Sequence, residues 1–218
     1  MPVVPTAHIF QPRYPLEADD VAPTRRAECV IIPDPRASPM RVAILTISDA
    51  GARGERADAS GDAAADWAVG QGAEVVARAI VSDDTVEIVR CLLGWCDDDI
   101  ADLVLTTGGT GLSIRDVTPE ATRAVIEREA TGIAERLRAI TGADFPRAAL
   151  GRGIAGTRGR TLIVNLPGST KGVRDSLDAF TPIARHAVDI LRGAPTDHSP
   201  GDASTLRLSS LAARERTP

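Results

Sequence analysis

The sequence predicts an α/β protein: a doubly wound three-layer sandwich with a mostly parallel sheet and one antiparallel hairpin strand. Two observations lead to this fold class. Short apolar segments alternate along the chain with segments of helical periodicity, as in βαβ units. In addition, the apolar run at 42–48 has no polar face, which is expected of a strand that is buried on both sides of a parallel sheet.

The first half of the chain contains apolar runs that are separated by amphipathic segments. Ser60 is a candidate N-cap for the first helix, and Gly70 and Gly72 are expected to end it. In the second helix, the apolar side chains recur at helical spacing and form one face. The expected elements are a strand at 42–48, a helix from 60 to 69, a strand at 73–81, a helix at 85–95 and a strand at 103–107.

In the second half, Thr118 is expected to cap a helix, with Pro119 in the first helical position and Glu120 in the first turn. The glycine-rich residues 156–159 are expected to turn a hairpin between two short strands. Pro182 is expected to interrupt the last helical region. The remaining expected elements are a helix through Ile126, a helix that carries Ile133, Leu137 and Ile140, strands at 152–155 and 161–164, and helical residues at 173–191.

Composition divides the chain into three parts. Residues 1–39 are rich in proline and lack sustained periodicity, so we expect a disordered or loosely docked leader, in which a short apolar run at 29–32 could add an edge strand. Residues 40–193 are the expected folded domain, and residues 194–218 are an expected flexible tail. With 43% hydrophobic residues, a domain of this size can bury a core.

Composition also excludes several classes of function. The net charge of −5 argues against a basic nucleic-acid surface, and an aromatic content of 3% argues against base-stacking platforms. The chain has 3 histidines, which leaves little material for a histidine zinc site or a Ser-His triad. Because there is neither a run of membrane-spanning length nor a signal pattern, we expect a soluble, cytoplasmic protein with reduced cysteines.

A glycine-rich loop follows the strand at 103–107 and carries the most specific pattern in the chain. Its glycines at 108, 109 and 111 allow a sharp turn and a close approach of the backbone to a ligand. The order strand, glycine loop, helix places backbone N–H groups where phosphate oxygens bind. Arg115 adds a cation, and Asp116 adds a candidate magnesium ligand, between the loop and the helix.

Polar loops follow the predicted strands at their carboxyl ends, which is where ligands bind in doubly wound folds. Arg115 and the only lysine, Lys171, would bind anionic oxygens there. Carboxylates and phosphates repel each other unless a cation lies between them. A Mg²⁺ ion bound by both would offset this repulsion for Asp49, Asp83 and Asp116. Any one aspartate alone could equally be an N-cap or a turn residue. The loops concerned lie at 48–49, 82–83, 108–116 and 167–171.

The stretch at 106–121 reads TTGGTG-x-x-x-RDVTPEA. It is similar, residue for residue, to the signature of the molybdenum-cofactor biosynthesis domain of the molybdopterin adenylyltransferase (Mog/MoaB-like) family. Residues 46–49, 60–61 and 165–169 also resemble motifs of this family. The resemblance covers about residues 41–193, which is nearly all of the expected folded domain.

The resemblance implies an adenylylation of molybdopterin, in which the terminal phosphate of the pterin attacks the α-phosphorus of ATP and pyrophosphate leaves. Asp116 matches the essential acidic residue of the glycine-loop motif, and Asp83 matches the second essential carboxylate. Both would also hold the Mg²⁺ ion. Asp84 adjoins Asp83, and Ser82 stands where the family usually has proline, so the second carboxylate stays open between Asp83 and Asp84.

The expected binding residues fall into two groups. Nucleotide and phosphate binding is expected at Ser48, Asp49, Thr107, Gly108, Gly109, Thr110, Gly111 and Arg115. Pterin binding is expected at Pro167, Gly168, Ser169 and Lys171. The family is typically trimeric, so the resemblance implies a homo-oligomer, and the molybdate-inserting enzyme of the pathway is a candidate partner.

Two other functions stay open. One is a non-catalytic molybdopterin-binding or scaffold protein of the same family, and the other is a nucleotide-processing hydrolase. A Rossmann dehydrogenase is disfavoured because the loop reads GGTG rather than GxGxxG, and because no ribose-binding acid follows about twenty residues later.

Overall fold

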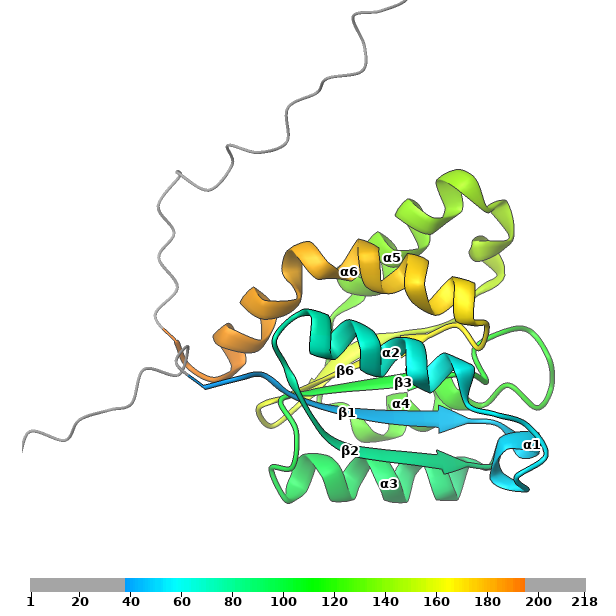
Figure 1. Cartoon of the computed structure of the whole chain (residues 1–218), viewed down its shortest axis with the longest axis horizontal. Helices are drawn as coiled ribbons and strands as arrows, with labels where there is room; N and C mark the ends of the chain where they lie inside the picture. Colours follow the sequence, from blue (N-terminus) through cyan, green and yellow to red (C-terminus); the bar gives the residue numbers. More distant parts are fainter. Residues whose placement is uncertain (1–37, 195–218) are drawn as a thin grey trace, which may run out of the picture. The chain divides into compact units, whose positions relative to one another are not determined.

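A sheet of 6 strands in the order β2-β1-β3-β6-β5-β4 forms the central layer of the computed structural model, which describes residues 38–194 (Figure 1). The strands β1, β2, β3 and β6 pair in parallel, whereas β5 pairs antiparallel with both β6 and β4. This arrangement confirms the predicted fold class. The predictions for the leader, its apolar run at 29–32 and nearly all of the tail lie outside the described residues.

The strands are β1 (Arg41–Ile47), β2 (Glu74–Val81), β3 (Leu103–Thr107), β4 (Arg128–Glu129), β5 (Ala155–Arg158) and β6 (Thr161–Leu166). The α-helices are α1 (Asp49–Ala52), α2 (Ala59–Gly70), α3 (Thr85–Asp97), α4 (Thr118–Val125), α5 (Thr131–Asp144) and α6 (Thr170–Leu191). A 3₁₀ helix, η1 (Pro146–Leu150), follows α5. The short elements α1, β4 and η1 were not predicted from the sequence.

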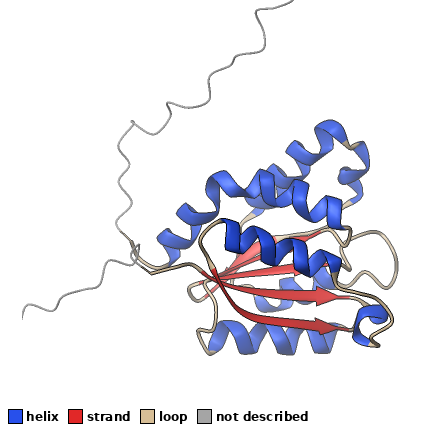
Figure 2. Cartoon of the chain, viewed as in Figure 1, coloured by secondary structure: helices blue, strands red, loops and turns tan. Residues whose placement is uncertain are grey.

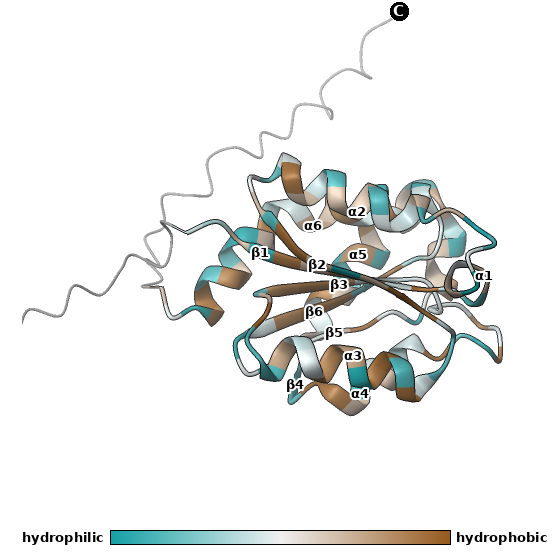
Figure 3. Cartoon of the chain, turned by 60° about the horizontal axis from the view of Figure 1, so that its bottom comes forward, coloured by the Kyte–Doolittle hydropathy of each residue, from teal (hydrophilic) through white to brown (hydrophobic). Residues whose placement is uncertain are grey.

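Helices cover both faces of the sheet, with α2, α5 and α6 on one side and α3 and α4 on the other (Figures 1 and 2). Side chains of a strand alternate between its two faces, so a central strand needs apolar residues at every position. Strand β3 largely follows this pattern: all of its residues are buried, with Leu103, Val104 and Leu105 apolar and two threonines at its carboxyl end. The colouring in Figure 3 shows mostly hydrophobic central strands between helices whose hydrophobic and hydrophilic segments alternate.

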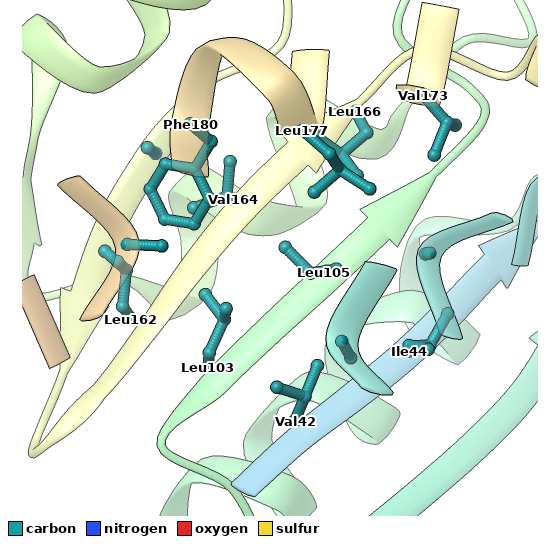
Figure 4. Close-up of a cluster of buried hydrophobic side chains, with 14 of the residues drawn as sticks. Val42, Ile44, Leu103, Leu105, Leu162, Val164, Leu166, Val173, Leu177 and Phe180 are labelled. Carbon is teal, nitrogen blue, oxygen red and sulfur yellow. The ribbon is translucent and has the colours of Figure 1, made fainter. Parts of the chain in front are cut away.

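The larger hydrophobic cluster joins α6 to the sheet (Figure 4). Phe180, Leu177 and Val173 of α6 are at most 1% exposed and belong to the same cluster as Leu105 and Leu166 of the strands. Burial of a large apolar side chain stabilises the fold by about 1.5–3 kcal/mol. This packing holds the first turn of α6 next to the carboxyl ends of β3 and β6, where the polar loops begin.

Helix α6 is continuous, so the predicted interruption at Pro182 is wrong. A proline inside a helix costs about 3 kcal/mol because it lacks the N–H group and crowds the preceding turn. Here the buried face of the helix, which includes Phe180 and Val188, outweighs this cost. The hydroxyl of Thr181, just before the proline, donates to the carbonyl of Leu177 in the preceding turn at 2.8 Å.

Two predicted N-caps are also wrong. The N-cap of α2 lies two residues earlier than expected: the carboxylate of Asp58 accepts the N–H of Gly61 at 2.8 Å and takes the role predicted for Ser60. Thr118 is the first residue of α4, and the preceding Val117 makes no side-chain cap. The Thr118 hydroxyl instead donates to the carbonyl of Gly108 at 2.9 Å, which ties α4 to the glycine loop.

The antiparallel hairpin exists, but its turn lies later than predicted. Strand β5 covers Ala155–Arg158 and pairs with β6 up to Arg158 and Thr161. The turn is therefore made by Gly159 and Arg160, and Gly159 has φ +53°, as a two-residue hairpin turn requires. Gly156 belongs to the strand, where a side chain would collide with the carbonyl of Arg128. A strand glycine that allows close packing was thus mistaken for a turn glycine.

None of the helices between residues 38 and 194 is both long enough and apolar enough to cross a bilayer.

Candidate active site

The loops after β1, β2, β3 and β6 meet at the carboxyl edge of the sheet, as the sequence predicts. The backbone N–H of Asp49 donates to the carboxylate of Asp83 at 3.0 Å, and the N–H of Asp83 donates to the carboxylate of Asp49 at the same distance. The hydroxyl of Thr107 donates to the carbonyl of Pro167 at 2.8 Å. These bonds join the loop after β1 to the loop after β2, and the loop after β3 to the loop after β6.

The glycine loop requires glycine at its first two positions. Gly108 has φ +100°, and a Cβ atom there would lie 2.2 Å from the carbonyl oxygen of Ile47. Gly109 has φ +61°, and a Cβ atom would lie 2.4 Å from the Thr118 hydroxyl. Both φ values fall in a region that L-residues rarely adopt. The backbone can therefore run close against β1 and α4 only because these two side chains are absent.

An arginine that the sequence analysis did not identify, Arg152, holds the second half of the glycine loop. Its guanidinium donates to the carbonyls of Gly111, at 2.7 Å, and Asp116, at 2.5 Å, and it pairs with the carboxylate of Glu120. Its backbone N–H also donates to the carbonyl of Thr110 at 2.8 Å. The position of Arg152 between two glycines just before a strand offered no local signal of this role.

Two cavities open at this edge and share four wall residues. The β1 cavity has a volume of about 440 Å³ and is lined by Thr46, Ile47, Ser48, Gly51, Arg56, Ala57, Asp58, Ala59, Ser60, Ile80, Asp83 and Thr107, together with Gly108 and the shared residues. The α5 cavity has a volume of about 370 Å³ and extends between the glycine loop, α5, η1 and the start of α6. The shared residues are Gly109, Asp116, Gly168 and Ser169.

The part of the α5 cavity formed by α5 and η1 has an apolar group of side chains and two arginines. The apolar side chains are Leu137, Phe145 and Leu150, of which Phe145 and Leu150 are exposed, and the arginines are Arg138 and Arg147. At the inner end of the cavity, Asn165 donates from its amide nitrogen to the hydroxyls of Thr106 and Thr122, both at 2.9 Å. A flat, partly polar ring system of the size of a pterin or a purine fits a cavity of this volume and lining.

Asp83 and Asp116 both line the β1 cavity, and each has one carboxylate oxygen engaged. In Asp83 the engaged oxygen accepts from Asp49, and in Asp116 it accepts the N–H of Ser113 at 2.9 Å. The second oxygen of each carboxylate accepts no hydrogen bond from any residue in the range 38–194. This donor set fits Mg²⁺, which takes one or two carboxylates and completes its octahedron with phosphate oxygens and water. In the described range, no group of three or more acidic, histidine or cysteine side chains could hold a metal, so the remaining ligands would have to come from substrate and water.

The structure separates Asp83 from its neighbour Asp84. The carboxylate of Asp84 accepts the N–H groups of Val86 and Glu87 at 2.9 and 3.0 Å and is the N-cap of α3. Asp84 does not line either cavity, whereas Asp83 does. Of the two alternatives that the sequence left open, Asp83 is therefore the one that reaches the candidate site.

Three of the predicted binding residues lie outside both linings. The guanidinium of Arg115 pairs with the carboxylate of Asp49 at 2.7 Å, and the ammonium of Lys171 pairs with Asp175 at 2.5 Å. The hydrogen bond from Arg115, and then that from the backbone of Asp83, lower the pKa of Asp49. The remaining predicted residues line one or both cavities: Ser48, Asp83, Thr107, Gly108, Gly109, Thr110, Gly111, Asp116, Pro167, Gly168 and Ser169.

Asp58 is a second residue that the sequence analysis missed. It lines the β1 cavity with a side chain that is 13% exposed, and it accepts hydrogen bonds from the hydroxyl of Thr46 and the guanidinium of Arg78. Its spacing from Ser60 and Gly61, which were assigned to a family motif, was the signal that could have identified it.

Comparison with known proteins identifies the family of the chain. Residues 43–186 match the family model described as "Probable molybdopterin binding domain". The molybdopterin adenylyltransferase of Helicobacter pylori strain J99 is 42% identical over 114 residues, which are 52% of this chain and 65% of that protein, so the match spans slightly less than two thirds of that relative. The molybdenum cofactor biosynthesis protein B of Escherichia coli K12 is 39% identical over 137 residues, covering 62% of this chain and 79% of that protein.

A solved structure extends the similarity to the whole domain. The crystal structure of the molybdopterin biosynthesis enzyme MoaB from Thermus thermophilus superimposes with a TM-score of 0.68 at 49% identity, and it covers 72% of this chain and 99% of that chain. The residues that line the two cavities all lie within the matched range 43–186. The chain therefore belongs to the molybdopterin-binding domain family of molybdenum cofactor biosynthesis proteins.

Proposed function

We propose that this protein transfers the adenylyl group of ATP to molybdopterin and releases pyrophosphate. The observation that carries the proposal is the junction of the two cavities. Two ligands bound in neighbouring cavities would bring their reactive groups together at Gly109, Asp116, Gly168 and Ser169. The relatives named molybdopterin adenylyltransferase support the choice of reaction.

In this proposal the nucleotide occupies the β1 cavity. The N–H groups of the glycine loop bind its phosphates, because backbone donors at a turn before a helix favour anionic oxygens. Ser48 and Thr107 complete the polar wall. Asp83 and Asp116 hold Mg²⁺, which when bound neutralises the phosphate charge and orients the phosphate oxygens.

The pterin occupies the α5 cavity, with its ring system against the apolar side chains of Leu137, Phe145 and Leu150. Its terminal phosphate lies at the first turn of α6, where Ser169 caps the helix by accepting the N–H of Gly172 at 3.1 Å. The N-terminus of a helix of 22 residues favours a bound anion through its dipole and its unpaired N–H groups. Pro167 and Gly168 complete the wall at this point.

The reaction needs positioning more than acid–base chemistry. An oxygen of the pterin phosphate forms a bond to the α-phosphorus of ATP, while the bond from that phosphorus to the bridging oxygen breaks and pyrophosphate leaves. The attacking phosphate oxygen is already ionised at neutral pH, so no general base is required. The chain's contribution is to hold both phosphates in line and to stabilise the charge that moves to the leaving group.

The test is pyrophosphate release from Mg-ATP, with and without molybdopterin, by the wild type and by Asp116→Asn. Pterin-dependent release that the substitution abolishes supports adenylyl transfer. Tight pterin binding without release, unchanged by the substitution, would instead support a non-catalytic binding protein. ATP hydrolysis in the absence of pterin would support the nucleotide hydrolase.

The same proposal extends to the organisation of the protein. We infer that residues 40–193 are the catalytic domain, with 1–39 as a leader and 194–218 as a tail, and that the protein works in the cytoplasm as a homotrimer. A molybdate-inserting enzyme would receive the adenylylated pterin. Light scattering of the full chain measures the oligomer, and a monomer at micromolar concentration would contradict the trimer.

A further inference from the structure

The wall of the β1 cavity carries more negative than positive charge. Among its lining residues, the acidic side chains are Asp58, Asp83 and Asp116, and Arg56 is the cationic one. Such a cavity repels a polyphosphate unless cations are supplied. A divalent metal would supply part of the positive charge that a polyphosphate needs, and the side chain of Arg56 supplies another part.

The other arginines around this cavity are already engaged in ion pairs. Arg53 makes two hydrogen bonds with Glu55, both at 2.8 Å. Arg78 pairs with Asp58 and Asp62, and Arg115 pairs with Asp49. Any of these three guanidinium groups would have to leave a carboxylate before it could bind a ligand.

Arg56 differs from these neighbours. It lines the cavity, it is exposed, and it makes no hydrogen bond or ion pair with another residue between 38 and 194. Its guanidinium can therefore bind an anion without breaking an existing contact. A guanidinium presents a planar fork of donors that matches two phosphate oxygens, and hydrogen bonds between charged groups are about twice as strong as neutral ones.

We infer that Arg56 binds the β- and γ-phosphates of the nucleotide and thus the pyrophosphate that leaves. This inference rests on the proposed function, because it assigns the nucleotide to the β1 cavity. It also replaces the sequence-based expectation that Arg115 supplies the cation at this place. The role of Arg56 is to bind the substrate and to stabilise the charge that grows on the leaving group as the bond to the α-phosphorus breaks.

The experiment compares Arg56→Ala with Arg53→Ala in the full-length protein. Arg53→Ala removes the same charge from the same loop, but Arg53 lies outside the cavity lining and already pairs with Glu55. Calorimetric titration with ATP, inorganic pyrophosphate and AMP, each with Mg²⁺, gives the dissociation constants. AMP lacks the phosphates that Arg56 is inferred to contact, so it reports on the rest of the nucleotide site.

For Arg56→Ala we expect about 10- to 100-fold weaker binding of ATP and pyrophosphate, the range for loss of a charged hydrogen bond, with AMP binding changed less than about twofold. Arg56→Lys should recover part of the loss, and Arg53→Ala should bind all three ligands like the wild type. If Arg56→Ala and Arg53→Ala weakened binding equally, or if Arg56→Ala weakened the binding of AMP as much as that of ATP, the role of Arg56 would be overturned while the proposed function would stand. A wild type that binds neither ATP nor pyrophosphate would overturn the proposed function as well.

Discussion

Asp49 and Asp83 exchange hydrogen bonds across the carboxyl edge of the sheet: the backbone N–H of each donates to the carboxylate of the other at 3.0 Å. The two residues follow the neighbouring parallel strands β1 and β2 by two positions each, so this exchange joins the segments that leave these strands. It also orients the carboxylate of Asp83, with one oxygen held by Asp49 and the other available in the β1 cavity. Arg115 completes the arrangement by pairing with the outer oxygen of Asp49.

The first prediction tests this exchange. Asp49→Ala removes the acceptor for the N–H of Asp83 and should lower kcat for pyrophosphate release by about 10- to 100-fold, the range for a misplaced catalytic group. Asp49→Asn keeps an oxygen acceptor and should lose less activity. Pterin affinity should not change in either variant. Equal kcat values for the alanine and asparagine variants would show that the loss of activity does not come from the missing hydrogen bond with the N–H of Asp83.

The second prediction concerns the glycine loop. Gly108→Ala places a Cβ atom 2.2 Å from the carbonyl oxygen of Ile47 at a φ of +100°, so the variant should lose at least about 2 kcal/mol of unfolding free energy, together with nucleotide binding. Gly94→Ala is the matched control, because Gly94 lies within the last turn of α3 and nothing within 4 Å meets its added Cβ. That variant should gain about 0.5–1 kcal/mol. Urea denaturation of both proteins measures the two changes, and a stable Gly108→Ala protein would contradict the geometry of the loop.

The third prediction concerns Arg152, which holds Gly111 and Asp116 by their carbonyls. Arg152→Lys keeps the charge but loses the fork that reaches both oxygens, so kcat should fall about tenfold or more while the KM for the pterin changes little. Glu120→Gln removes only the ion pair on the outer side of Arg152 and should have a smaller effect. Steady-state kinetics of the two variants measure the difference. A lysine variant as active as the wild type would exclude a positioning role for Arg152.

The fourth prediction concerns a buried ion cluster that lies away from the active site. Asp102 is 5% exposed and pairs with both Arg41 and Arg192. Burial acts most strongly on its pKa and raises it, but the hydrogen bonds from Arg41 and Arg192 together outweigh burial, so the pKa of Asp102 is lowered from its ordinary value of 3.8. Asp102→Asn should lower the unfolding free energy by about 3 kcal/mol near neutral pH, because it removes the charge that these guanidinium groups share.

The pH dependence of that difference follows from the sign of the pKa shift. A carboxyl group with a lowered pKa in the folded state contributes its full stabilisation above the unfolded value, and the contribution disappears as the pH falls through the folded pKa. The gap between wild type and Asp102→Asn should therefore be constant from about pH 5 to 8 and narrow below 3.8. Denaturation at several pH values measures it, and a gap that widens in acid would contradict the cluster's role.

Much of the fold could be predicted because its signals are local. The apolar runs at 42–45 in β1 and 103–105 in β3 predict strands buried on both faces, and the order of strands and helices predicts a doubly wound sheet. Gly108, Gly109 and Asp116 sit within a few residues of one another, so their pattern could be recognised in the sequence alone.

The wrong predictions at Pro182 and in the hairpin have a common cause: contacts with residues distant in the sequence outweigh the local conformational preference. Pro182 predicts a break in the last helix, but burial of Phe180 and its neighbours against the sheet keeps the helix continuous. Gly156 resembles a turn residue, yet it permits the close packing of β5 against the carbonyl of Arg128. In both cases the local preference amounts to a few kcal/mol, which packing over a whole element can outweigh.

The sequence by itself determined the fold class, the position of the glycine loop and the identity of its aspartate, because these depend on periodicity and on neighbours along the chain. Only the tertiary structure decided which charged groups are available to a ligand. Arg115 pairs with a carboxylate 66 positions away, and Arg152 binds a carbonyl 41 positions away. Whether a charged side chain is available to a ligand depends on its partners in space, and a local sequence pattern does not show partners that are so distant along the chain. For this reason the structure was needed to show that Arg56 and Asp83, rather than Arg115 and Asp84, line the cavity.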